Sequence, residues 1–200
     1  MDVSAAILAG GKNLRMGRKN KALLEVDGQS FLERTVSRLR PLFRQIMIVG
    51  QDNPGYSGIG LPVFPDLRPG VGSLGGLLTA LRRSAAPKTF CIACDMPFLQ
   101  PTVVAYLLEE AAGGWDIVIP RLPEGLEPLC AVYSVSLATR IEGLLDRGEK
   151  RIRTLIEGSR TRYVDVDELR PLDPRLLTFV NINTPDDLKR VTTVEEGVRG

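Results

Sequence analysis

Short apolar runs alternate along the chain with segments whose apolar residues recur at helical spacing. In one such segment, Phe31, Leu32 and Val36 fall close to one face of a helix. The runs expected to form strands are residues 3–9, 45–49, 61–64, 90–93, 116–119, 129–133, 162–166 and 179–182. The segments expected to form helices are residues 30–42, 74–83, 101–112, 135–145, 152–156 and 184–190. This alternation predicts an α/β fold with a mostly parallel central sheet.

The length of the chain indicates a single domain. A chain of 200 residues can bury most of the surface that its unfolded form exposes. The sequence contains no repeat and no linker that would divide it. We therefore expect residues 1–190 to form one domain and residues 191–200 to form a frayed tail. Residues after about Leu122 are expected to form a C-terminal subregion over one end of the sheet.

The charge balance argues against nucleic acid and membranes as partners. The 26 lysines and arginines nearly match the 24 aspartates and glutamates, which leaves a net charge of +2. Such a balance provides no electrostatic reason to expect DNA, RNA or an anionic membrane surface. No apolar run approaches the roughly 20 residues of a membrane span, and no basic leader precedes the strand that begins at Val3. These observations favour a cytoplasmic protein.

The sequence contains no histidine. This composition excludes histidine general bases, Ser-His-Asp triads and histidine-ligated zinc from any active site built by this chain. Catalysis would have to rely on carboxylates, lysine, arginine, backbone amides and a hard cation.

The three cysteines do not indicate a disulfide framework. Cys91 and Cys94 have the Cys-x-x-Cys spacing, so a metal or redox site is the alternative to a structural role. Both lie within residues 89–95, an apolar run typical of a strand, and residues three apart on a strand point to opposite faces. We therefore expect both to be structural and buried.

The first apolar run passes directly into a loop rich in glycine and positive charge. Gly10 and Gly11 allow backbone amides to approach a ligand closely, and Lys12, Arg15 and Lys21 add three cations. Amides that cradle oxygens and cations that neutralise charge suit a polyphosphate. The spacing matches neither the Walker A loop nor the Gly-x-Gly-x-x-Gly fingerprint. A solvated basic loop after a strand is the alternative interpretation.

Two aspartates follow apolar runs at positions where the carboxyl ends of strands would meet. Asp66 precedes a glycine-rich stretch and is well placed for a base edge or a ribose hydroxyl. Asp95 precedes Met96 and Pro97 and suits Mg²⁺, which takes one or two carboxylates and completes its shell with phosphate and water. A turn or a helix cap would also explain Asp95.

A fourth motif lies near the C-terminus. Asn181 and Asn183 alternate with apolar residues, which predicts that both amides face the same side of a strand. Two neutral hydrogen-bonding groups side by side suit a polar ligand or metal-bound water. Capping of the following helix by Asn183 or Thr184 is the alternative, and it leaves Asn181 unexplained.

Taken together, these motifs resemble the molybdenum cofactor guanylyltransferase (MobA) family of Rossmann-like nucleotidyltransferases. The opening loop resembles the Leu-Ala-Gly-Gly…Arg-Met-Gly…Lys signature of that family, and residues 92–97 resemble its metal-binding Cys-Asp-x-Pro segment. Residues 127–133 resemble its acceptor-side segment, and residues 181–185 its closing strand and helix. The resemblance covers nearly the whole chain and implies a single Rossmann-like three-layer domain.

The resemblance implies the Mg²⁺-dependent transfer of GMP from GTP to the terminal phosphate of Mo-molybdopterin, with release of pyrophosphate. The implied catalytic residues are Arg15, Lys21 and Asp95, of which Asp95 would hold Mg²⁺. The nucleotide would be bound by Leu8, Ala9, Gly10, Gly11, Lys21, Asp66 and Asp95. Asn181 and Asn183 would line the acceptor side, and molybdenum-cofactor or molybdoenzyme proteins would be the protein partners.

Two alternatives stay open. One is a different base or acceptor, as in a molybdopterin cytidylyltransferase or a transferase that acts on a sugar or alcohol phosphate. Gly10 and Gly11 favour guanine, because cytidylyltransferases usually have Ala-Ala-Gly there. The other alternative is a noncatalytic nucleotide-binding protein, against which the presence of both Lys21 and Asp95 argues.

The chain departs from the family pattern at one place. Family members can carry a polar residue near the nucleotide, after the second strand. In this sequence residues 49–50 are Val-Gly, so any contact with the nucleotide there is expected through the backbone.

Overall fold

A central β-sheet organises the chain, and the computed structural model describes residues 2–10, 20–182 and 187. The strands are β1 (Val3–Leu8), β4 (Ile46–Val49), β5 (Val63–Phe64), β6 (Lys88–Ala93), β7 (Ile117–Leu122), β8 (Gly125–Leu126), β9 (Cys130–Ser134) and β10 (Thr161–Asp165). Their order is β10-β7-β9-β6-β1-β4-β5, and β8 pairs with β7. β9 is antiparallel to both neighbours and β8 is antiparallel to β7, whereas the other pairs are parallel. The predicted α/β fold with a mostly parallel sheet is confirmed.

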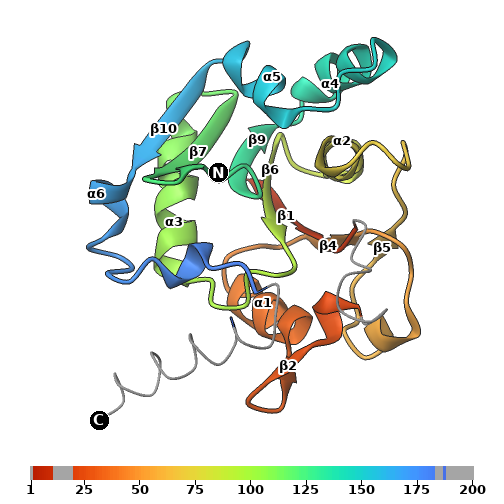
Figure 1. Cartoon of the computed structure of the whole chain (residues 1–200), viewed down its shortest axis with the longest axis vertical. Helices are drawn as coiled ribbons and strands as arrows, with labels where there is room; N and C mark the ends of the chain where they lie inside the picture. Colours follow the sequence, from red (N-terminus) through yellow and green to blue (C-terminus); the bar gives the residue numbers. More distant parts are fainter. Residues whose placement is uncertain (1, 11–19, 183–186, 188–200) are drawn as a thin grey trace.

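Helices cover both faces of the sheet (Figure 1). They are α1 (Phe31–Leu39), α2 (Ser73–Arg83), α3 (Pro101–Glu110), α4 (Leu137–Asp146), α5 (Ile152–Glu157) and α6 (Val166–Leu169). Buried residues of α1 and α3 pack with one side of the strands, including Ile7 and Phe90. Buried residues of α2 and α4, which lie beside each other, pack with the other side, including Met47 and Ile117. The result is the predicted three-layer arrangement.

The strand β1 shows why a run of apolar residues, without polar alternation, forms the middle of this sheet. All six of its residues are buried. Ala5 and Ile7 belong to the core under α1 and α3, whereas Ala6 and Leu8 belong to the core under α2 and α4. Because both faces are covered by helices, a central parallel strand has no face that meets water.

The two cysteines with Cys-x-x-Cys spacing occupy opposite cores, as predicted. Cys91 packs in the core with α2 and α4, and Cys94 packs in the core with α1 and α3. Both are buried free thiols, as is Cys130. Burial raises the pKa of all three thiols, that of Cys94 to about 12, so they remain protonated and inert.

The strand predicted at residues 179–182 is not formed. Leu177–Phe179 is instead a short 3-10 helix, η5, and residues 180–182 have no regular secondary structure. Phe179 and Ile182 are buried in apolar clusters, so their alternation reflects tertiary packing and not a strand. The backbone N–H of Ile182 donates to the carbonyl of Asp95 at 2.9 Å, which replaces a ladder bond. The helix predicted at 184–190 lies outside the described residues, apart from Asp187, and so does the predicted tail.

The C-terminal third of the chain lies at one end of the sheet and also helps to build it. It supplies β9, which inserts between β6 and β7, and the edge strand β10. The sequence pattern missed the hairpin of β2 (Glu25–Val26) and β3 (Gln29–Ser30), the short β8 and the single-turn α6. No helix in the described part of the chain is long and apolar enough to cross a membrane.

Candidate active site

A cavity of about 680 Å³ opens at the carboxyl ends of β1, β4, β5 and β6. This is the edge at which open α/β sheets bind ligands. The residues that line it are Leu8, Gly10, Val49, Gln51, Asp66, Pro69, Gly70, Val71, Gly72, Ser73, Gly76, Ala93, Cys94, Asp95, Leu129 and Lys150. Most of the described residues that the motifs singled out therefore meet in one place.

The end of β1 and the end of β4 form one wall of this cavity. The backbone N–H of Ala9 donates to the carbonyl of Val49 at 2.8 Å, which continues the pairing beyond β1. A Cβ on Gly50 would lie 3.0 Å from the carbonyl carbon of Ala9 and 3.0 Å from the amide nitrogen of Gly10. Only a glycine allows this approach of two backbones, so the wall at Gly10 is made of main-chain atoms.

Asp66 extends its carboxylate into the same wall. Its Oδ1 atom is buried and has no hydrogen-bond partner among the described residues. A Cβ on Gly10 would lie 3.5 Å from one carboxylate oxygen, and a Cβ on Gly76 would lie 3.8 Å from the other. Burial raises the pKa of Asp66 above its usual value. An unpaired buried acceptor is costly, so this oxygen is suited to a donor supplied by a ligand.

The loop that follows Asp66 is anchored to α2. The backbone N–H of Leu67 donates to Thr79 Oγ1 at 2.9 Å, and that hydroxyl donates to the carbonyl of Gly75 at 3.0 Å. Thr79 is fully buried. A Cβ on Gly75 would come within 2.7 Å of the carbonyl oxygen of Arg68, so the loop lies directly against the helix. The glycine-rich loop at residues 69–73, which lines the cavity, is therefore anchored to α2.

Lys21 and Asp95 form an ion pair at the cavity. Lys21 begins the 3-10 helix η2 (Lys21–Leu23), which Asn20 caps, and Asp95 follows β6. The Nζ atom of Lys21 lies 3.2 Å from Oδ2 of Asp95, and the side chains are 8% and 20% exposed, respectively. The two residues are 74 positions apart in sequence, and the fold brings them together.

The acceptor-side residues have a mixed outcome. Asn181 is exposed and precedes Ile182, whose N–H donates to the carbonyl of Asp95, so this segment reaches the site. Asn183 lies outside the described residues, as do Gly11, Lys12 and Arg15. Because residues 180–182 form no strand, the predicted alignment of two amides on one strand face has no basis in the described structure.

Glu127 adds a carboxyl group with altered acidity. It precedes Leu129, which lines the cavity. Burial, with a smaller contribution from the negative charge of Asp95, raises the pKa of Glu127 to about 7, although the hydrogen bond from the Leu129 backbone opposes both effects. The sequence placed Glu127 in an acceptor-side segment without indicating its acidity, because burial is a tertiary property.

Several further cavity residues lie outside the four motifs. Gln51 lines the cavity beside Val49, where only a backbone contact was expected. Its position two residues after the end of β4, at the carboxyl edge of the sheet, is the sequence signal for it. Ser73, the first residue of α2, and Lys150, between α4 and α5, also line the cavity. For Lys150 no motif was available, since it lies in a turn between two helices.

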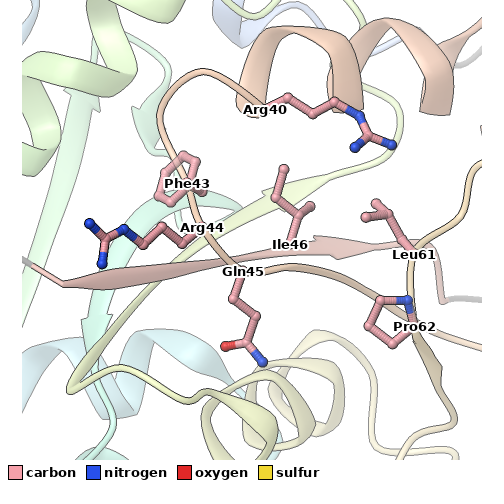
Figure 2. A pocket seen from close by; sticks show the side chains of 7 residues that line it. All are labelled: Arg40, Phe43, Arg44, Gln45, Ile46, Leu61 and Pro62. Atoms are coloured by element: carbon pink, nitrogen blue, oxygen red, sulfur yellow. The ribbon is translucent and has the colours of Figure 1, made fainter.

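A second cavity, of about 360 Å³, lies at the opposite, amino-terminal end of β4. Figure 2 shows its lining residues, which are Arg40, Phe43, Arg44, Gln45, Ile46, Leu61 and Pro62. Arg40 and Arg44 extend away from one another in this view, so their charges do not converge on a common point. None of these residues belongs to a motif, and the larger cavity is therefore the candidate active site.

The donor set at Asp95 is suited to a hard cation bound together with a substrate. No group of three or more histidine, cysteine, aspartate or glutamate side chains within the described ranges is arranged to hold a metal. A single carboxylate at the cavity matches Mg²⁺, which usually retains waters and takes substrate phosphates as further ligands. Asp95 is thus the residue that could hold such an ion.

Comparison with known proteins identifies the family. The model of the MobA-like NTP transferase domain matches residues 5–166. The chain belongs to this family. It is 36% identical, over 100% of its length and 96% of the relative's, to a probable molybdenum cofactor guanylyltransferase of Pelotomaculum thermopropionicum. It is 34% identical, over 94% of its length and 93% of the relative's, to a molybdenum cofactor guanylyltransferase of Desulfosudis oleivorans. The chain is accordingly a nucleotidyltransferase.

Solved structures agree with this assignment. The molybdopterin-guanine dinucleotide biosynthesis protein A of Archaeoglobus fulgidus superposes with a TM-score of 0.82 at 32% identity, covering 97% of this chain and 99% of that one. A 2-C-methyl-D-erythritol 4-phosphate cytidylyltransferase of Thermus thermophilus superposes with a TM-score of 0.70 at 19% identity, over 98% of this chain and 100% of that one. The second likeness concerns the fold alone.

Proposed function

We propose that this protein is a molybdenum cofactor guanylyltransferase. It transfers GMP from GTP to the terminal phosphate of Mo-molybdopterin, releases pyrophosphate and forms the molybdopterin guanine dinucleotide cofactor. The observation that carries the proposal is that Asp66 and Asp95 line one cavity on the carboxyl edge of the sheet and that Lys21 pairs with Asp95. Full-length relatives named for this activity support the choice of substrates.

The nucleotide occupies the wall formed by β1, β4 and β5. Backbone groups of Leu8, Ala9 and Gly10, with Gly11 beyond, bind it where Gly50 allows the two main chains to approach. Asp66 meets the nucleoside, because its buried, unpaired oxygen accepts hydrogen bonds and a guanine edge presents N–H donors. A hydrogen bond from the base to this oxygen would remove the energetic cost of a buried acceptor without a partner.

Lys21, Arg15 and Asp95 act on the phosphates. Lys21 neutralises negative charge near the reacting phosphorus. The carboxylate of Asp95, 3.2 Å from the ammonium group of Lys21, holds that group beside the cavity. Asp95 would hold Mg²⁺, which would supply charge stabilisation and help to orient the phosphate oxygens. Arg15 is assigned here from the resemblance of the loop alone.

The reaction needs no general base. An ionised oxygen of the acceptor phosphate forms a bond to the α-phosphorus, and the bond from that phosphorus to the oxygen bridging toward the β-phosphorus breaks. Pyrophosphate leaves with that electron pair. Such a transfer depends mainly on positioning and charge stabilisation, so a chain without histidine is equipped to catalyse it.

The acceptor approaches from the side of β9. Asn181 and Asn183 and the segment 127–133 are assigned to this side. We further propose that the enzyme works in the cytoplasm, where it receives Mo-molybdopterin from, or passes the product to, molybdenum-cofactor or molybdoenzyme proteins. The three buried free thiols support this location, because reducing compartments keep cysteines in that state.

Nucleotide binding by calorimetry tests the proposal first. With Mg²⁺ present, GTP is expected to bind clearly more tightly than CTP, ATP or UTP, and GTP alone to support transfer to Mo-molybdopterin. A preference for CTP would move the protein to the cytidylyltransferases. Binding of GTP without transfer to any acceptor phosphate would favour the noncatalytic alternative.

A further inference from the structure

Lys150 lines the candidate cavity from a part of the chain that none of the four motifs covers. It lies in the turn between α4 and α5 and is exposed. Among the described residues that line the cavity, Lys150 is the one cation, whereas Asp66 and Asp95 are acids. A positive charge therefore stands on the wall of a cavity proposed to receive two polyanionic substrates.

The end of α4 fixes the turn that carries Lys150. Gly148 adopts the left-handed conformation, with a φ of 77°. Its N–H donates to the carbonyl of Leu145 at 2.9 Å, and the N–H of Glu149 donates to the carbonyl of Leu144 at 3.0 Å. This pair of bonds is a Schellman motif, which ends a helix at a defined place. Because α4 packs beside α2, whose first turn lines the cavity, the position of Lys150 is set by the fold.

The neighbours of Lys150 in sequence bind each other. The carboxylate of Glu149 accepts hydrogen bonds from the backbone N–H of Arg151 at 2.8 Å and from its guanidinium at 2.6 Å. These bonds hold the pKa of Glu149 at about 2. Lys150 itself makes no ion pair with any residue in the described ranges. The charge of Lys150 is therefore available to a ligand, while those of Glu149 and Arg151 offset each other.

Lys150 belongs to the part of the chain that follows β9, the strand beside β6 on the proposed acceptor side. Asp95 ends β6, which lies between β1 and β9. Gly10 and Asp66 follow β1 and β5 on one side, where the proposed nucleotide binds, whereas Leu129 and Lys150 belong to the chain around and after β9. An in-line transfer brings the attacking and leaving oxygens to opposite sides of the phosphorus. The nucleotide is assigned to β1, β4 and β5, so a cavity cation from outside those strands is a candidate for the attacking oxygen.

We propose that Lys150 binds an anionic oxygen of the acceptor's phosphate monoester and places it for attack on the α-phosphorus. This inference rests on the proposed function. In the step, the acceptor oxygen forms its bond to the α-phosphorus as the bond to the pyrophosphate oxygen breaks, and no proton moves. Lys21 serves the nucleotide phosphates and Lys150 serves the acceptor, so the two polyanions have separate cations.

The test compares Lys150→Ala with the wild-type enzyme at varied Mo-molybdopterin. Its KM for the acceptor should rise about 10- to 100-fold, which corresponds to the loss of one hydrogen bond to a charged group. The Tm should be unchanged because Lys150 is exposed, and the Kd for GTP with Mg²⁺ should be unchanged because the proposal assigns Lys150 to the acceptor and not to the nucleotide. Lys150→Arg should recover most of the loss. Arg147→Ala, which removes a cation at the end of α4 that does not line the cavity, is the matched control.

The outcomes separate this inference from the proposed function. An unchanged acceptor KM in Lys150→Ala, with the wild-type enzyme active, would overturn the role of Lys150 alone. A weaker Kd for GTP with an unchanged acceptor KM would assign Lys150 to the nucleotide and overturn it too. A wild-type protein that transfers no nucleotide would instead contradict the proposed function. If CTP proves to be the substrate, the same comparison is made with CTP, since the role of Lys150 does not depend on the base.

Discussion

Among single residues, the Lys21–Asp95 pair shows how a charge arrangement can serve a site more than it serves stability. The Lys21 side chain is 8% exposed, so its ammonium group has lost most of its water. Burial of an ion pair carries a desolvation penalty that its attraction often only balances. The net stabilisation of such a pair is small, whereas its position at the cavity places both charges where phosphates are proposed to bind. We therefore interpret the pair as part of the proposed phosphate-binding site and not as a source of stability.

Replacement of Asp95 by asparagine tests this interpretation. Asp95→Asn removes the charge that would hold Mg²⁺ but keeps an oxygen that can accept a hydrogen bond from Lys21. The Mg²⁺-dependent kcat should fall by about 1000-fold, the scale of a lost electrostatic contact in a transition state. Steady-state kinetics over a range of Mg²⁺ concentrations measures the effect. Asp167→Asn, an exposed carboxylate in α6, is the control. Asp95→Asn with wild-type kcat would remove Asp95 from the metal site.

On the scale of elements, the loop between β5 and α2 depends on one buried hydroxyl. Thr79 accepts from the Leu67 N–H and donates to the Gly75 carbonyl, and so connects the cavity loop with the interior of the helix. Gly70 and Gly72 have positive φ angles, of 77° and 72°, which turn the backbone of this loop. Glycine has no side chain that could restrict the conformation of the loop further. The order of the nucleotide wall is therefore expected to depend on that hydrogen bond.

A pair of isosteric substitutions examines this dependence. Thr79→Val keeps the shape but leaves the Leu67 N–H without its acceptor, so it should cost about 1–3 kcal/mol in unfolding free energy and weaken GTP binding. Thr89→Val is the matched control, because Thr89 is also fully buried but its hydroxyl has no partner among the described residues. That change should be neutral or stabilising. Chemical denaturation and calorimetry give both quantities, and equal effects of the two substitutions would show that the hydroxyl of Thr79 does not anchor the loop.

On the scale of the whole molecule, carboxyl groups pull the pH dependence of stability in two directions. Arginine partners lower the pKa of Glu142 and Asp165, so their contribution is present at neutral pH and is lost as the pH falls. The contribution of Glu127 to stability changes with pH in the opposite direction, because burial raises its pKa from 4.5 to about 7. The folded protein thus retains this proton where the unfolded chain has lost it, and stability falls as the pH rises from 4.5 to about 7.

Glu127→Gln isolates this second contribution. The variant carries no charge at any pH, so above pH 7 it should unfold at a Tm about 2–4 °C higher than the wild-type protein, or roughly 1 kcal/mol for a chain of this size. Below pH 4.5 the difference should disappear, since both proteins are then neutral at this position. Thermal unfolding of both proteins, monitored by circular dichroism below pH 4.5 and above pH 7, measures these differences in Tm. A constant difference across the pH range would mean that Glu127 titrates normally in the folded protein.

The sequence by itself determined the elements that depend on local patterns. Ser30 and Glu33 satisfy each other's backbone N–H groups in a capping box, so α1 begins within one residue of the start expected at residue 30. The central strands were evident because a sheet covered on both faces needs continuous apolar runs. Asp66 and Asp95 were singled out because they follow such runs, and both line the cavity. The edge of the sheet at which the candidate site lies was therefore predictable from the sequence.

Tertiary structure decided what depends on distant partners. Residues 179–182 have the composition of a strand, but packing of Phe179 and Ile182 and the bond to the Asp95 carbonyl give them another conformation. The acidity of Glu127 and the place of Lys150 in the cavity arise from burial and from the packing of α4 on α2. Local spacing records only neighbours a few residues away, whereas desolvation and long-range contacts depend on which segments the fold brings together.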